Sequence, residues 1–332
     1  MILGFSYVLA AGILQGLWLL PMDRVRGWRW EESWLGFSFF GMLAFNWLFT
    51  LATIPQILDI YRAAPANDLG RLLLFGLGCG VGAVLFGLGM ARLGLALGYA
   101  IIMGLIASLG ALVPLLLFFP QAVFSAKGAL IIGGTLVVLI GILLCSRAAE
   151  IKTGPSAAAR SGLVAGLVIA IAAGALSSLP NIGMTFAGGV IASAQAHGVS
   201  ATLAGNAVWA LFFTAEFSVN AGYCLYRMWR ARGEKPAAER PLLRNLFWTA
   251  LMGILWIGSF YGYGVGAARL GPLGPVVGWP LFIIISIAVG NVVGLMRGEW
   301  RGASMAARGL LAAGLAVLIA AVTLIAAGGA LT

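Results

Sequence analysis

Charged side chains are scarce in this chain. Asp, Glu, Lys and Arg together make up 9% of its 332 residues, whereas 61% of the residues are hydrophobic. A soluble globular domain carries roughly a quarter charged residues. The scarcity of charge therefore excludes a water-soluble globule and makes each ionisable group inside an apolar run informative.

Cysteine and histidine are also rare. Cys79, Cys145 and Cys224 each fall inside an apolar run without the spacing of a metal site, so we interpret them as small core residues rather than disulfides or ligands. The only histidine, His197, lies between apolar runs. Without a metal cluster, a Ser/His/Asp set or paired carboxylates inside these runs, the sequence predicts neither an enzyme nor a bound cofactor.

Glycine is abundant, with 48 copies. The run from Gly76 to Gly82 resembles a phosphate-binding loop but lacks the G-x-G-x-x-G spacing and the lysine of a P-loop, so ATP-driven transport gains no support. Other glycines are four residues apart, as in the pairs Gly12 and Gly16 or Gly78 and Gly82. This spacing lets helix backbones approach closely in lipid.

Long apolar runs dominate the chain. A helix of about 20 residues crosses the ~30 Å hydrocarbon core, and backbone groups in lipid must be paired within the segment, so each long run should be a helix. The predicted fold class is an all-α membrane protein with ten transmembrane helices. They are residues 2–20, 34–54, 72–91, 95–118, 129–146, 162–183, 203–226, 246–266, 273–296 and 309–328.

Basic residues indicate how the chain is oriented. The formal net charge is +10, but the Lys and Arg residues lie in short segments between apolar runs, which favours basic loops at a membrane surface over a nucleic-acid partner. Sixteen of the 20 basic residues lie in loops that follow odd-numbered helices. The positive-inside rule therefore places those loops in the cytoplasm and both chain termini outside it.

An internal repeat gives the domain organisation. The segments 86–94 and 263–271 share the pattern G-x-G-x-A-R-L-G, and a weaker match pairs Ala10-Ala-Gly12 with Ala172-Ala-Gly174. The predicted topology puts Arg92 and Arg269 on opposite sides of the membrane. We therefore expect an inverted repeat of five plus five helices, with residues 1–147 as the first repeat, 148–160 as a cytoplasmic linker and 161–332 as the second repeat.

Glu216 is the one acidic residue that falls in mid-membrane. It lies on a helical stripe that also includes Asn206, Trp209, Phe213, Asn220 and Tyr223. A carboxyl group in lipid, away from any basic partner, is favoured as the neutral acid, which a proton carrier requires. The alternative is a neutral Glu that joins helices by a hydrogen bond. We expect Glu216 to be the proton-coupling residue.

Aromatic rings and amides inside the helices suggest the cargo. Rings stack on the C–H faces of sugars, and amides both donate to and accept from hydroxyls. The candidate substrate-binding residues are Gln15, Trp18, Asn181, Asn206, Trp209, Asn220, Tyr223, Trp256, Tyr263 and Trp279. Each is also an ordinary packing residue. Pro272, Pro275 and Pro280 further predict that the helix at 273–296 is discontinuous.

A set of residues spread along the chain matches the pattern of a known family. These residues are Pro21, Val25, Trp28, Trp30, Glu31, Phe75, Gly76, Gly87, Leu88, Arg92, Leu93, Gly94, Gly290, Val293, Gly294, Leu295, Glu299, Trp300 and Ala303. Through them the chain resembles, along nearly its whole length, the L-rhamnose–proton symporters of the drug/metabolite transporter superfamily. The resemblance implies the drug/metabolite transporter fold in a bacterial inner membrane, with periplasmic termini and proton-driven uptake of a deoxyhexose. It also implies a carboxylate in the ninth helix, where this chain reads G-P-V-V-G-W, and the proton site therefore passes to Glu216.

These observations together predict a proton-coupled symporter that takes up a monosaccharide by alternating access, with sugar, protons and the lipid bilayer as its partners. Two alternatives stay open. One is an exporter or facilitator of another small polar metabolite, such as an amino acid, on the same fold. The other is a non-transporting membrane sensor or assembly subunit, which the absence of a soluble output domain disfavours.

Overall fold

The computed structural model describes residues 1–153, 163–232, 241–298 and 300–330 of the chain. Its first half consists of helices. No strand occurs within these ranges. The elements up to the predicted linker are α1 Ile2–Leu17, η1 Leu20–Arg24, α2 Trp30–Ser38, the π-helix η2 Phe39–Ala44, α3 Phe45–Thr53, α4 Ile57–Ala63, α5 Ala66–Phe118, α6 Pro120–Val123 and α7 Ala126–Thr153.

The second half is also helical. The start of the predicted linker 148–160 is part of α7, and its residues from 154 onward lie outside the described ranges. The later elements are α8 Leu163–Ser177, α9 Leu179–Phe186, α10 Gly188–Ala196, α11 Ala201–Ala204, α12 Ala207–Arg230, α13 Leu242–Arg269, α14 Gly274–Met296 and α15 Met305–Ala330.

Nine helical segments in the described part of the chain are long and apolar enough to cross a membrane. The prediction of an all-helical membrane protein is therefore confirmed. The predicted helix at 203–226 is absent from the nine, although α12 covers most of it with 24 residues. Its polar stripe explains the difference, because Glu216 and Asn220 lower its mean hydropathy.

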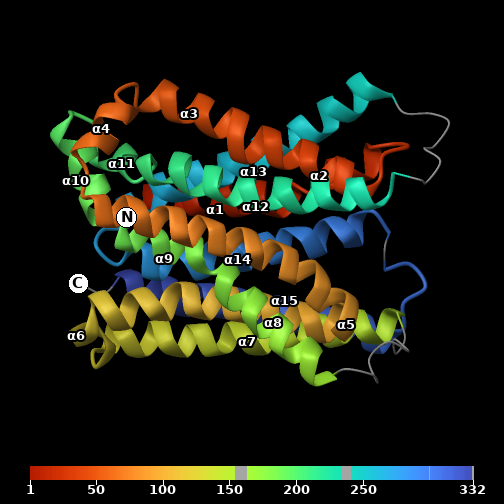
Figure 1. Cartoon of the computed structure of the whole chain (residues 1–332). Helices are drawn as coiled ribbons and strands as arrows, with labels where there is room; N and C mark the ends of the chain where they lie inside the picture. Colours follow the sequence, from red (N-terminus) through yellow and green to blue (C-terminus); the bar gives the residue numbers. More distant parts are fainter. Residues whose placement is uncertain (154–162, 233–240, 299, 331–332) are drawn as a thin grey trace.

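α5 reverses direction within one helical element. The sequence predicts two helices, 72–91 and 95–118, with a loop between them, whereas α5 is helical throughout its 53 residues. A Cβ atom at Gly98 would nevertheless lie 3.3 Å from the carbonyl oxygen of Gly89, although nine residues of a straight helix span about 13 Å. The two parts of α5 therefore run in opposite directions from this reversal, as the orange and yellow ribbons of Figure 1 show.

The predicted break in the ninth helix is wrong. α14 is continuous from Gly274 to Met296 and contains Pro280. Pro275 lies in its first turn, where a missing N–H costs no hydrogen bond, so this proline starts the helix rather than interrupting it. The actual interruption follows α8, where Ser178 separates α8 from α9 and Pro180 lies in the first turn of the new helix.

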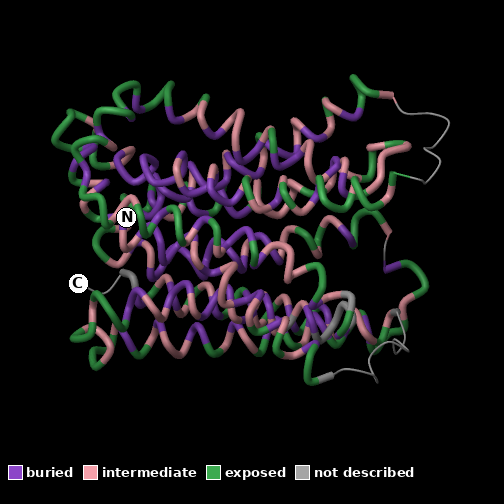
Figure 2. The backbone as a smooth tube through the Cα atoms, viewed as in Figure 1, coloured by how far each residue is buried: buried purple, intermediate pink, exposed green. Residues whose placement is uncertain are grey.

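The helices form one elongated bundle whose outer surface is apolar. Figure 1 shows both ends of the described chain at the left of the bundle, and Figure 2 shows buried segments concentrated between the helices. Large apolar side chains such as Phe124, Val164 and Leu243 are strongly exposed. Such exposure suits contact with lipid and would be unfavourable in water.

The predicted close packing at glycine pairs is confirmed where α1 crosses α14. A Cβ atom would lie 2.7 Å from Ile285 if added at Gly12 and 2.7 Å from Val289 if added at Gly16. Because real Cβ contacts are longer, only glycine lets the two backbones approach this closely.

Candidate functional site

Glu216 is buried in the middle of α12, with 4% of its surface exposed. The thiol of Cys79 on α5 lies beside its carboxyl group. The Oε2 atom of the same carboxyl has no hydrogen-bond partner among the described residues. A buried polar atom without a partner is unfavourable, and a carboxyl group retained at such a position usually has a role in binding or proton transfer, so Glu216 is the starting point of the candidate site.

Glycines on two faces of α5 let this helix pack closely on α12 and on α8 beside Glu216. A Cβ atom at Gly80 would lie 3.0 Å from the backbone oxygen of Glu216, so this face packs directly on α12. A Cβ atom at Gly82 would lie 2.9 Å from the Cβ of Leu176, so the other face packs on α8. The alternating glycines therefore bring Cys79 against Glu216 while α5 contacts both neighbours.

Replacing Gly80 by Ala should destabilise the protein. The new Cβ atom would lie 2.7 Å from the Cβ of Val219 on α12, and such overpacking costs about 1–3 kcal/mol. Gly87→Ala on the same helix is the matched control, because its Cβ atom would meet nothing within 4 Å. Thermal unfolding in detergent should show a lower midpoint for Gly80→Ala alone. Equal midpoints would contradict the close α5–α12 packing.

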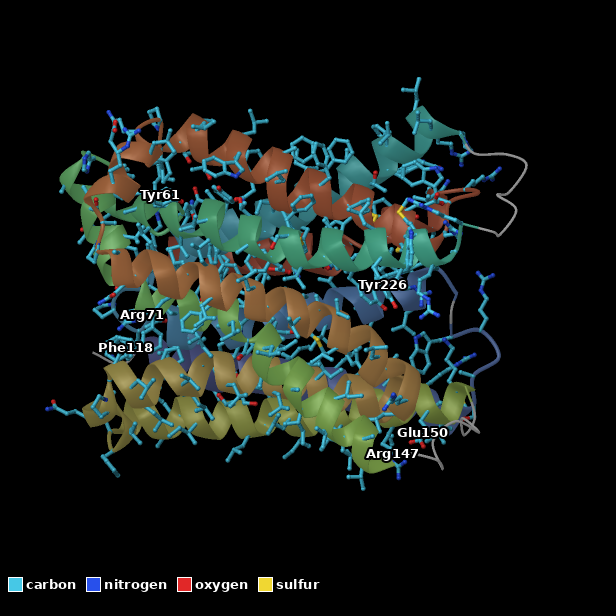
Figure 3. All side chains as sticks on the ribbon, viewed as in Figure 1. Tyr61, Arg71, Phe118, Arg147, Glu150 and Tyr226 are labelled. Atoms are coloured by element: carbon cyan, nitrogen blue, oxygen red, sulfur yellow. The ribbon has the colours of Figure 1, made fainter. Side chains whose placement is uncertain are left out.

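Charged residues elsewhere lie toward the ends of the bundle. Figure 3 shows Arg71 at one end and the Arg147–Glu150 ion pair at the other, and both arginines are more than half exposed. The middle of the bundle is therefore poor in charge, which makes the position of Glu216 distinctive.

Aromatic side chains surround the level of Glu216. Phe213, one turn earlier on α12, lies with its ring centroid 4.7 Å from that of Trp256 on α13. Trp256 contacts Phe37 of α2 at 5.6 Å, and Phe37 contacts Trp18, the residue that follows α1, at 4.7 Å. These four rings therefore join two helices from each half of the chain.

Polar groups lie at the edge of this ring cluster. The Ser259 hydroxyl donates to Gln15 Oε1 at 2.7 Å, and the Trp34 indole N–H donates to Asn220 Oδ1 at 2.9 Å. Asn220 Nδ2 in turn donates to the backbone oxygen of Glu216 at 3.1 Å. We call the following set the central cluster: Gln15, Trp18, Trp34, Phe37, Phe213, Glu216, Asn220, Trp256 and Ser259.

Three other predicted binding residues form their hydrogen bonds outside the central cluster. Asn181 Nδ2 donates to the backbone oxygens of Gly110 at 2.6 Å and Pro275 at 3.0 Å, and the Tyr263 hydroxyl donates to Asn181 Oδ1. Trp279 Nε1 donates to the Ile106 oxygen at 2.8 Å. Because these polar groups already bond to protein partners, the geometry favours a structural role for all three.

The remaining predicted residues are not members of the central cluster. Trp209 stacks on Phe213 at its edge, but the Trp209 ring is fully buried and its indole N–H already donates to Asn206 Oδ1 at 3.2 Å. Tyr223 is half-buried nearer the C-terminal end of α12. Of the ten predicted binding residues, the structure thus connects Gln15, Trp18, Asn220 and Trp256 to one another and to α12 through the ring contacts and hydrogen bonds of the central cluster.

Sequence reasoning missed two partners of the site. Cys79 is a free, buried cysteine, as predicted, but its contact with Glu216 was not anticipated. For Trp34, the sequence predicts only that it begins the helix at 34–54. The sequence offers one signal for each residue. Cys79 is flanked by glycines, and Trp34 lies one turn after Glu31. Neither signal identifies the helix that the residue will contact.

The chain is similar to known proteins along nearly its whole length. The family model described as L-rhamnose-proton symport protein (RhaT) matches residues 1–331. The L-rhamnose-proton symporter of Cronobacter sakazakii is 28% identical over 317 residues, which cover 93% of this chain and 92% of the relative. The corresponding symporters of Klebsiella pneumoniae and Escherichia coli O9:H4 are 27% and 25% identical over the same length and coverage.

Proposed function

The chain belongs to the L-rhamnose-proton symport protein family, and from this premise we propose that it is a proton-coupled symporter for a monosaccharide. It is a multi-pass membrane transporter and not an enzyme. A deoxyhexose such as L-rhamnose is the proposed cargo, by analogy with the relatives of that name. The observation that carries the proton coupling is the buried carboxyl of Glu216 with its unpartnered Oε2.

The central cluster suits a sugar better than an ion or a lipid. Half-buried Trp18 offers a ring face for sugar C–H groups, and the amide of Gln15 can bond to hydroxyls. Both residues lie at the C-terminal end of α1, whereas Glu216 and Trp256 come from the second half of the chain. A substrate held between them would contact both halves, as alternating access requires.

We propose that α12 is a tenth membrane span. Its 24 residues are sufficient for the hydrocarbon core, and the two ends of the described chain lie at the same end of the bundle (Figure 1), which requires an even number of crossings. The ten spans would then form two inverted repeats, residues 1–147 and 161–332, in a bacterial inner membrane with periplasmic termini.

Contacts at matching repeat positions support the inversion. A Cβ atom at Gly4 would lie 3.0 Å from Leu270, and one at Gly166 would lie 2.6 Å from Leu93. Leu93 and Leu270 are the leucines of the two A-R-L-G segments. The repeated motif therefore packs on the first helix of the opposite half in both cases.

A second pair of contacts follows the same relation. Gly12 and Gly174 end the two matched A-A-G segments. A Cβ atom at Gly12 would lie 2.7 Å from Ile285 of α14, and one at Gly174 would lie 2.6 Å from Leu105 of α5. Each glycine thus contacts the fourth helix of the other repeat. A two-fold axis in the membrane plane would relate these two contacts to each other.

Purified protein in liposomes tests the proposed function. With an inward proton gradient, L-rhamnose should accumulate inside, and adding L-rhamnose should drive proton uptake. A thermal-shift screen of monosaccharides identifies the cargo first, because a bound ligand raises the stability of the folded state. Transport without sugar-induced proton uptake would instead support a facilitator or exporter, and no transport of any tested solute would contradict the proposal.

A further inference from the structure

A buried hydroxyl group on α2 has no hydrogen-bond partner. The Oγ atom of Ser38, the last residue of α2, is unpartnered among the described residues, and the Ser38 side chain is fully buried. Such a hydroxyl has lost its hydrogen bonds to water without a replacement, which destabilises the folded protein. Its presence in the apolar interior therefore requires an explanation.

The other buried hydroxyl groups show that Ser38 is unusual. Every other buried Ser or Thr in the described residues except Ser146 donates to a backbone oxygen, as Thr50 does to the oxygen of Asn46. A Ser in a helix commonly bonds to the carbonyl oxygen one turn earlier. The Ser38 hydroxyl does not use this option, so it stays available to a ligand.

Ser38 lies on the face of α2 and η2 that packs on α12. Trp34, one turn earlier, donates to Asn220 Oδ1 at 2.9 Å, and Met42, one turn later, has its Sδ atom 3.9 Å from Asn220 Nδ2. Residues one turn apart share a helix face, so Ser38 lies between two residues that both contact Asn220. The Asn220 amide itself bonds to Trp34 and to the backbone oxygen of Glu216, and it leaves the Ser38 hydroxyl without a partner.

The antiparallel packing of these segments brings Ser38 to the level of Glu216. The start of α2 meets the C-terminal end of α12, and α3 meets the beginning of α12, as can be followed in Figure 1. Counted from the contact of Trp34 with Asn220, Ser38 is one turn later on α2 and Glu216 is one turn earlier on α12. In antiparallel helices these two steps run in the same direction.

Two unpartnered oxygens therefore lie at one level, and each comes from a different half of the chain. They are Oγ of Ser38 and Oε2 of Glu216. Phe37, the residue before Ser38, contacts the rings of Trp18 and Trp256 in the central cluster. Aromatic rings beside unpartnered polar groups suit a monosaccharide, because its C–H face is apolar and its hydroxyls both donate and accept.

We propose that Ser38 is a specificity-determining residue of the transport site, and that its hydroxyl bonds to one ring hydroxyl of the bound monosaccharide. This inference rests on the proposed function and adds a group from α2 to the central cluster. The bound sugar supplies the partner that the protein does not provide. An apolar solute of the same size would leave the Ser38 hydroxyl unpaired, so the residue favours a hydroxylated cargo.

Ser38→Ala should weaken the binding of L-rhamnose without destabilising the sugar-free protein. Calorimetric titration in detergent should show an affinity lower by about fivefold, the effect of one hydrogen bond. The unfolding midpoint without sugar should be equal to or above that of the wild type, because an unpartnered buried hydroxyl is removed. Ser146→Ala is the matched control. It removes the other unpartnered buried hydroxyl, on α7 outside the central cluster, and should keep the wild-type affinity.

Monodeoxy analogues of L-rhamnose, each lacking one ring hydroxyl, identify the bond. One analogue should bind the wild type about fivefold more weakly than L-rhamnose does. The same analogue should lose no further affinity in Ser38→Ala, because the hydroxyl and its partner act as a unit. Ser38→Cys, which has a weaker hydrogen-bonding group, must show the same pattern if Ser38→Ala fails to fold.

Two results would overturn the proposal. One is wild-type affinity for L-rhamnose in Ser38→Ala, and the other is a loss of affinity that adds to the loss for every analogue. If either occurs while the wild type binds and accumulates the sugar, the role of Ser38 is wrong and the proposed function stands. If the wild type binds no monosaccharide, the proposed function itself is contradicted.

Discussion

Glu216→Gln is expected to abolish proton-driven accumulation of sugar while preserving sugar binding and exchange. Gln has nearly the same shape as Glu and keeps a hydrogen-bonding group beside Cys79, but it cannot release a proton. An inward gradient of one pH unit supplies about 1.4 kcal/mol per proton, which corresponds to about tenfold accumulation for one-to-one coupling. In the variant the internal sugar concentration should rise only to the external value.

The measurement compares net uptake with counterflow in the same liposomes. Asp59→Asn is a suitable control, because Asp59 is an exposed acid that pairs with Arg62 at the end of the bundle. It should keep full accumulation. Accumulation that stays at the wild-type level in Glu216→Gln would exclude Glu216 as the proton carrier and favour its role as a hydrogen-bonded link between helices.

Asn181→Ala should be the most destabilising of the substitutions considered. The Asn181 side chain joins α9 to α5, α13 and α14 through two donated hydrogen bonds and one accepted from Tyr263. Truncation leaves the partner groups buried without a replacement, and each such group costs about 1–3 kcal/mol. The expected total loss of stability is about 3–5 kcal/mol.

Unfolding of the protein in detergent, induced by heat or by denaturant, tests this expectation. Asn291→Ala is the matched control, because the Asn291 amide donates to Ile287 within its own helix and is only partly buried. That variant should lose less than about 1 kcal/mol. If Asn181→Ala unfolds like the wild type but no longer shows a sugar-induced thermal shift, Asn181 contacts the substrate instead.

Several features of the fold could be predicted because their causes are local. A run of apolar residues must become a buried or lipid-facing helix wherever it lies, so the predicted spans match nine observed segments. The errors arose where tertiary packing overrides local signals. α5 stays helical where a loop is predicted, and α14 stays intact around Pro280.

The candidate site was predictable only in part. Glu216 stood out because no other acid lies within an apolar run, and the structure buries it. Its contacts with Cys79 and, through Asn220, with Trp34 join helices far apart in the sequence. No periodicity in one helix indicates which face of another helix it will meet.

The amino-acid sequence by itself determined the membrane class of this protein, the position of most helices and the presence of one carboxyl in the apolar interior. These properties follow from transfer free energies and helical periodicity, which depend on neighbouring residues alone. Only the tertiary structure decided which polar residues are already satisfied, as Asn181 and Trp279 are, and which remain beside Glu216. Hydrogen-bond satisfaction depends on partners from other helices, so it is a property of the packed bundle.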